Sequence, residues 1–228
     1  MDMEEYDCIK KQRVLEMITE PFLERYAKEG WKLNKTSGFL QQNTDFGHVE
    51  IVLSVTGYWP LEQLFCSYFT VHHRAVEKLA YDLFEYKRVV DIKSLKYHST
   101  VISPRIHLKE EDPARQEVTL RSEADIARLI PELLDGFERI GMEFFKKYSN
   151  LKAVADHEVD DFEEKRVHGS HAWNYGICVH LLATLKLAKD ERLGHYLHLF
   201  RTDPRVHKYS RADETDTFLS ALNAFNKD

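Results

Sequence analysis

Cysteine and glycine are both scarce in this sequence. The 228 residues include 3 Cys and 9 Gly. Cys8, Cys66 and Cys178 lie far apart and form no C-x-x-C pair, so the sequence supports neither a disulfide framework nor a thiolate zinc site. A reducing compartment therefore fits the chain best. The shortage of glycine also argues against a phosphate-binding glycine-rich loop.

Long apolar runs are missing as well. No run approaches the ~18 residues that a membrane-spanning helix needs. The N-terminal residues are acidic and include no hydrophobic core of a signal peptide. We therefore expect a cytoplasmic protein that has no membrane partner.

The charge of the chain excludes a further class of partner. The formal net charge is −6, and no stripe of Lys and Arg follows one face of any expected element. Nucleic-acid binding draws its affinity largely from phosphate neutralisation, so we expect no nucleic-acid partner. Hydrophobic residues make up 43% and charged residues 31%, which is typical of a globular domain.

The hydrophobic spacing predicts an α+β fold. A helix is expected over 4–29, kinked or divided at Pro21 and ended by Gly30. An antiparallel sheet of about five strands follows, and the chain is helical beyond Tyr148. The expected strands are 31–42, 46–56, 64–73, 97–108 and 116–120. Because strands and helices are segregated, we expect one domain over 1–228, with the helical C-terminal third packed on the sheet.

Smaller features of the sequence add detail to this predicted fold. Within 46–56, one face should carry Val49, Ile51, Leu53 and Val55, while His48, Glu50 and Ser54 point the other way. A short helix is expected over 75–86. The series Ser122-Glu-Ala-Asp125 resembles a capping box that starts a long amphipathic helix, which Pro131 should bend. A subdivision into 1–149 and 150–228 is the one alternative to a single domain.

Histidine is plentiful, with 12 residues. His168 with His171, and His195 with His198, have the i, i+3 spacing that places two side chains on one helix face, as a metal-binding pair requires. These four are the candidate metal ligands. His72 and His73 close a strand and should point to opposite faces, so they cannot both bind one ion.

Two other clusters have both a structural and a functional interpretation. The acidic run from Asp156 to Glu164 includes no calcium-loop pattern, so a solvated helix or a negative surface for a basic partner is expected. Aromatic residues gather in the strands and at the turn that follows them. A pocket or docking patch would include Trp31, Tyr58, Trp59 and Phe69, unless helices cover both faces of the sheet.

Familiar catalytic motifs are absent. The sequence includes no G-x-G-x-x-G, no G-x-x-x-x-G-K-[ST] and no G-x-S-x-G. Ser170 next to His171 and Cys178 near His180 are neighbours in sequence only, so they identify no nucleophile and base.

The order of elements resembles the DUF4304-like group of uncharacterised bacterial domains. The similarity involves Gly30-Trp31-Lys32, the hairpin through 46–55, the stretch from Val118 to Ile126 and the stretch from Phe144 to Leu151. No catalytic residues accompany such a family. The resemblance implies a bacterial intracellular protein, of the immunity-protein kind that blocks a toxin by binding it.

The sequence thus favours a non-enzymatic intracellular protein-binding domain whose partner has a basic surface. Two alternatives stay open: a metal- or histidine-dependent enzyme, and a small-molecule binder that uses an aromatic sheet face. The sequence names no cofactor and no oligomeric state.

Overall fold

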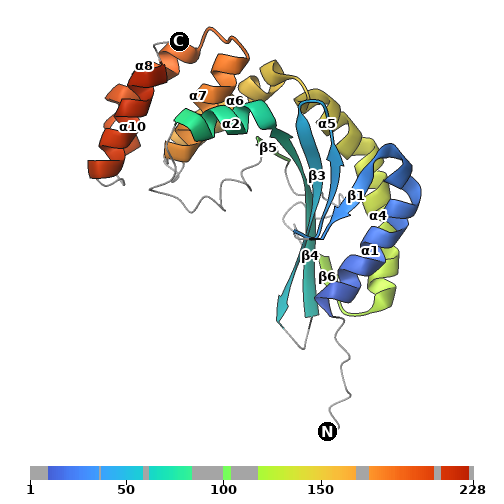
Figure 1. Ribbon diagram of the computed structural model, residues 1–228. Helices are drawn as coiled ribbons and strands as arrows, with labels where there is room; N and C mark the ends of the chain where they lie inside the picture. The colour runs from blue at the N-terminus through green and yellow to red at the C-terminus, as the bar shows by residue number, and fades with distance from the viewer. Residues whose placement is uncertain are drawn as a thin grey trace. The chain divides into compact units, whose positions relative to one another are not determined.

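A computed structural model describes residues 10–35, 37–58, 62–83, 100–103, 118–167, 175–207 and 212–225. The predicted fold class is confirmed: the chain has an N-terminal helix, a mostly antiparallel six-stranded sheet and several C-terminal helices (Figure 1). The chain divides into two compact units. Unit 1 comprises Met1–Val71 and Ile102–Lys146, and unit 2 comprises His72–Val101 and Lys147–Asp228.

The sheet has the strand order β1-β2-β3-β4-β5, and β6 pairs with β4. The strands are β1 (Trp31–Asn34), β2 (Phe39–Asn43), β3 (Gly47–Tyr58), β4 (Glu62–His73), β5 (Val101–Ile102) and β6 (Val118–Leu120). The expected strand over 31–42 is in fact a hairpin, with Trp31 opposite Gln42. Its turn depends on Gly38, whose φ is +76°, a conformation that side chains disfavour. Most of the strand expected over 97–108 lies outside the described residues.

Two helices cover one face of the sheet in unit 1. Helix α1 (Lys11–Tyr26) and helix α4 (Glu123–Gly136) lie side by side in Figure 1. Pro21 lies inside α1, which continues through it, so the predicted division of the helix is wrong. The capping box is confirmed: the Ser122 side chain accepts from the Asp125 backbone N–H, and the Asp125 side chain accepts from the Ser122 backbone N–H.

A π-helical segment follows α4 and brings a glycine against the sheet. This segment, η3 (Phe137–Gly141), leads into α5 (Met142–Tyr148). The Gly141 backbone lies so near Phe69 of β4 that an added Cβ would be 2.8 Å from the ring. Phe137 and Phe145 pack against Phe69, with ring centroids 6.4 and 5.4 Å away. These rings form the centre of the core of unit 1.

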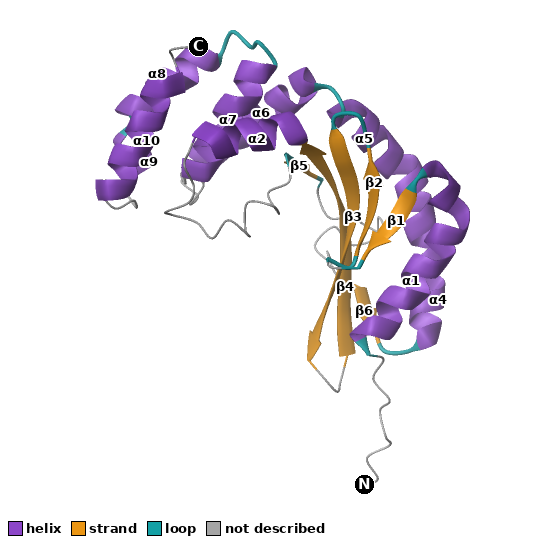
Figure 2. Cartoon of the chain, viewed as in Figure 1, coloured by secondary structure: helices purple, strands orange, loops and turns teal. Residues whose placement is uncertain are grey.

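Unit 2 is almost wholly helical in its described residues (Figure 2). Its helices are α2 (Arg74–Leu83), α6 (Leu151–Val167), α7 (Tyr175–Leu187), α8 (Leu193–Thr202), α9 (Pro204–His207) and α10 (Ala212–Phe225). Helix α7 lies in the middle of this unit and packs against α2, α6 and α8. Its buried side chains are apolar on several sides of the helix, as a central helix requires.

Candidate metal centre

Polar side chains cluster on one face of the neighbouring strands β3 and β4. His48 and Glu50 alternate along β3 and therefore share a face. The Oγ1 atom of Thr70 on β4 is 3.5 Å from the Glu50 carboxylate, and His72 follows Thr70 by two residues on the same face. Strand β4 is unbroken from Glu62 to His73, so it places His72 beside this part of β3.

This group is compact and largely buried. One ligand atom from each of His48, Glu50 and His72 lies within 4.8 Å of those of the other two. The His48 Nε2 atom is 3.5 Å from a Glu50 oxygen. Zinc bonds of ~2.0–2.1 Å in tetrahedral geometry separate two ligand atoms by about 3.4 Å, so this pair already has the spacing of two ligands of one ion. The exposed fractions of Glu50 and His72 are 9% and 3%.

A second carboxylate orients His72. The Nδ1 atom of His72 is 2.9 Å from Glu77 Oε1. Helix α2 begins at Arg74, directly after β4, and this strand-to-helix junction brings Glu77 back over the end of the strand. When Nδ1–H donates to Glu77, the lone pair of the neutral ring lies on Nε2. Metal-binding histidines in proteins have this arrangement, in which a carboxylate fixes the ring and increases its basicity.

His73 has a different role from its neighbour. Its Nε2–H donates to the backbone carbonyl of Tyr148 at 2.7 Å, and its backbone N–H donates to Thr100 Oγ1 at 2.9 Å. Burial lowers the pKa of His73, and the Tyr148 carbonyl only partly opposes this effect. His73 is thus a neutral residue of the core. The prediction that His72 and His73 cannot share one ion agrees with these separate partners.

A second histidine–carboxylate pair lies in unit 2. His180 on α7 and Glu158 on α6 are joined by a contact of 2.9 Å between Nδ1 and Oε1. Burial lowers the pKa of His180, but the negative charge of Glu158 and the hydrogen bond to it outweigh burial, and Glu77 adds to their effect. The pKa of His180 is therefore raised, and its charged form is held as an ion pair.

Two of the predicted metal ligands, His195 and His198, do not belong to the group on β3 and β4. His195 and His198 both lie exposed on α8, and the His195 ring contacts that of Tyr196 at a centroid distance of 5.0 Å. His168 and His171 lie outside the described residues, so a site formed by all four histidines stays a prediction.

The predicted aromatic patch lies partly in the core. Trp31 and Phe69 are 3% and 0% exposed, and their rings pack with Phe137 beneath α1 and α4. Phe69 also lines an apolar cavity of about 20 Å³, which is too small for a ligand of several atoms. Helices thus cover this face of the sheet, and these two side chains are not on the surface. Trp59 and the side chain of Tyr58 lie outside what the structure describes.

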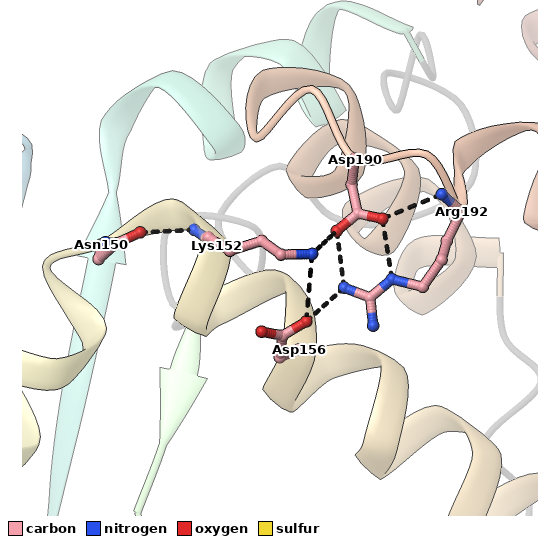
Figure 3. A network of polar contacts seen from close by, with 5 residues as sticks. All are labelled: Asn150, Lys152, Asp156, Asp190 and Arg192. Atoms are coloured by element: carbon pink, nitrogen blue, oxygen red, sulfur yellow. Dashed lines mark hydrogen bonds and ion pairs between the residues drawn. The ribbon is translucent and has the colours of Figure 1, made fainter.

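Some side chains of the acidic run from Asp156 to Glu164 contact other parts of unit 2 instead of pointing only into solvent. The run lies on α6, where Asp156 accepts from Arg192 at 2.5 Å and Glu163 accepts from the Tyr196 hydroxyl at 2.9 Å. Arg192 also binds Asp190, which Lys152 contacts from α6 (Figure 3). The expectation of a solvated helix is therefore correct for Asp156, Asp160 and Glu164, which are exposed, whereas the Glu158 side chain is only 12% exposed.

The cysteines that the structure describes include no candidate nucleophile. Cys178 is 0% exposed, and burial raises the pKa of its thiol far above the usual range. Cys66 is free and buried. As the sequence indicates, both behave as small apolar side chains.

The signal that could have identified the metal group is the spacing His48-x-Glu50 on a strand, with a histidine at the end of a later strand. Alternation alone does not show it, because polar residues on one face of a strand usually point to solvent. The structure shows instead that Glu50 and Val52 are both buried on this face.

Comparison with known proteins identifies no relative: no family model, no curated protein and no solved structure matches the chain. The resemblance to the DUF4304-like group therefore stays a prediction. No helix among the described residues is long and apolar enough to cross a membrane.

Proposed function

We propose that this protein binds a divalent first-row transition metal ion through His48, Glu50 and His72. The observation that carries this proposal is the mutual approach of their ligand atoms, all within 4.8 Å. Two imidazole nitrogens with one carboxylate oxygen form a donor set that zinc and iron(II) accept in proteins. Glu77 supplies the outer carboxylate that such sites commonly include.

A metal ion accounts for this group better than ion pairs alone do. One buried carboxylate needs one positive partner, but here two histidines approach Glu50. Two imidazolium rings side by side would repel each other, whereas two neutral rings each offer a lone pair. A divalent cation neutralises the carboxylate and uses both lone pairs, so it satisfies the whole group.

Three protein ligands leave room for a further ligand. A four-coordinate ion held by three side chains keeps one position for water or substrate, which is the arrangement of catalytic zinc sites rather than structural ones. The side chain of His48 is 26% exposed, so solvent reaches this edge of the group. Water bound at such a position would be activated towards deprotonation. We therefore propose a metal-dependent activity of this kind.

Equilibrium dialysis of the full chain against zinc, without a histidine tag and at pH 7.5, tests the proposal. We expect about one equivalent of zinc in the wild type. The variants His48→Gln, Glu50→Gln and His72→Gln should each lose affinity by more than the ~10–100-fold that removal of an outer partner costs. His195→Gln, an exposed histidine on α8, is the control and should bind as the wild type does. A wild type that retains well below one equivalent would refute the proposal.

A further inference from the structure

The two oxygens of the Glu50 carboxylate have different neighbours. Oε1 lies 3.5 Å from the Nε2 atom of His48, and Oε2 lies 3.5 Å from the Oγ1 atom of Thr70. An ionised carboxylate only accepts hydrogen bonds, so the Thr70 hydroxyl is the donor in its contact. The distance to His48 matches the separation of about 3.4 Å between two ligand atoms of one zinc ion. Oε1 is therefore the oxygen that faces the ion.

Strand β4 places Thr70 beside this carboxylate. Thr70 and His72 are two residues apart on β4 and therefore share the sheet face that contacts Glu50. The exposed fractions of Thr70 and Glu50 are 1% and 9%. Because both residues are buried, solvent cannot readily replace the hydroxyl, and a buried carboxylate oxygen that loses its donor is destabilised. Thr70 thus has the position and the burial to hold the carboxylate in one orientation.

The orientation of Glu50 decides how many donor atoms the protein supplies. A carboxylate that binds through one oxygen gives, with two imidazole nitrogens, three donors, so a four-coordinate zinc ion keeps one position for water or substrate. Carboxylates also bind metal ions through both oxygens, and here the second oxygen would occupy that position. The hydrogen bond from Thr70 opposes this change, because it fixes the rotation of the carboxylate with only Oε1 turned towards His48.

We propose that Thr70 is a positioning residue of the metal centre, which makes Glu50 bind the ion through Oε1 alone and so keeps the fourth position open. This inference rests on the proposed metal binding through His48, Glu50 and His72. Thr70 itself does not contact the ion. Loss of its hydroxyl should therefore change both the affinity for zinc and the binding mode of the carboxylate.

Infrared difference spectra of the full-length wild type, with zinc minus without zinc, test the binding mode. The antisymmetric and symmetric stretches of a carboxylate are further apart when one oxygen binds the metal than when both do. The wild type should show the wide separation, in bands that are absent from the variant Glu50→Gln. A narrow separation in the wild type would overturn the inference, whether or not any Thr70 variant folds.

Zinc dialysis of variants tests the hydroxyl itself. Thr70→Val keeps the shape of the side chain without the donor, so it should lower the affinity ~10–100-fold and narrow the infrared separation. Thr70→Ser retains the hydroxyl and should restore both properties. The control is Ser67→Ala, which removes a buried β4 hydroxyl that has no hydrogen-bond partner among the described residues and should bind zinc as the wild type does. Thermal unfolding confirms that each variant is folded.

The outcomes separate the inference from the proposed function. If the wild type binds zinc, His48→Gln abolishes binding and Thr70→Val binds as tightly as the wild type, the inference is wrong and the proposed function stands. A loss of affinity in Thr70→Val that Thr70→Ser shares would also contradict the inference, because packing rather than the hydroxyl would then be responsible. If the wild type binds no zinc, both fail.

Discussion

Removal of the Asp190 carboxylate should destabilise the helical unit strongly. Its side chain is 0% exposed and accepts four hydrogen bonds from two basic residues. One oxygen accepts from the Arg192 backbone N–H at 3.0 Å and from Arg192 Nε at 2.8 Å. The other accepts from Lys152 Nζ and from the Arg192 guanidinium, each at 2.6 Å (Figure 3). The network joins α6 to the turn between α7 and α8.

The size of the expected loss of stability follows from the burial of Asp190 and from the exposure of its partners Lys152 and Arg192. Removal of one member of a buried ion pair costs ~3–5 kcal/mol when the other charge is left buried. Here Lys152 is 57% and Arg192 30% exposed, and Asp156 still contacts both, so the stranded charges keep partners. We therefore expect Asp190→Ala to lower the free energy of unfolding by about 3 kcal/mol at pH 7, at the low end of that range.

The stabilisation by the Asp190 carboxylate should decrease as the pH falls. The hydrogen bonds from Arg192, with the one from Lys152, hold the pKa of Asp190 far below its ordinary value. A carboxyl group whose pKa is depressed on folding stabilises the protein fully above its unfolded pKa of about 3.9 and loses that contribution as the pH falls towards the folded pKa. The difference between wild type and Asp190→Asn should thus be smaller at pH 3 than at pH 7.

Urea unfolding, followed by circular dichroism at 222 nm, measures both the loss of stability in the Asp190 variants and its dependence on pH. The control is Asp160→Asn, an exposed residue of α6, which should change stability by no more than about 0.5 kcal/mol. An Asp190→Ala variant as stable as this control would refute the reasoning, as would a difference that grows on acidification.

Three other substitutions test separate parts of the structure. Gly141→Ala places a methyl group 2.8 Å from the Phe69 ring and should cost ~1–3 kcal/mol in urea unfolding, whereas Gly194→Ala, with nothing within 4 Å, should not destabilise. Ser122→Ala removes a helix cap and should lower the free energy of unfolding by ~1 kcal/mol. Glu77→Gln should weaken zinc binding ~10–100-fold in dialysis while leaving the fold intact, as shown by an unchanged circular dichroism spectrum.

Local signals in the sequence predicted local structure well. Three predicted features depend only on residues close in sequence, and the structure contains all three. They are the capping box at Ser122, the helix end at Gly30, and the buried strand face of Val49, Ile51, Leu53 and Val55. The hairpin within 31–42 was missed because a turn at Gly38 inside an otherwise strand-like pattern resembles a continuous strand.

The group formed by His48, Glu50 and His72 was not found from the sequence, because this group depends on contacts between distant residues. The alternation separated Glu50 from the apolar face correctly, but it could not show that Glu50 is buried beside His72, which is 22 positions away in sequence. Spacing favoured His195 and His198 instead, and these lie exposed. The expectation of a protein partner with a basic surface, and with it a toxin-immunity role, stays a prediction.

Diffraction data collected at the zinc absorption edge from crystals grown with zinc would test metal binding most directly. The account predicts an anomalous peak about 2.0–2.2 Å from a nitrogen of His48, a nitrogen of His72 and an oxygen of Glu50. A peak at His195 and His198 alone, or no peak at any protein residue, would contradict it.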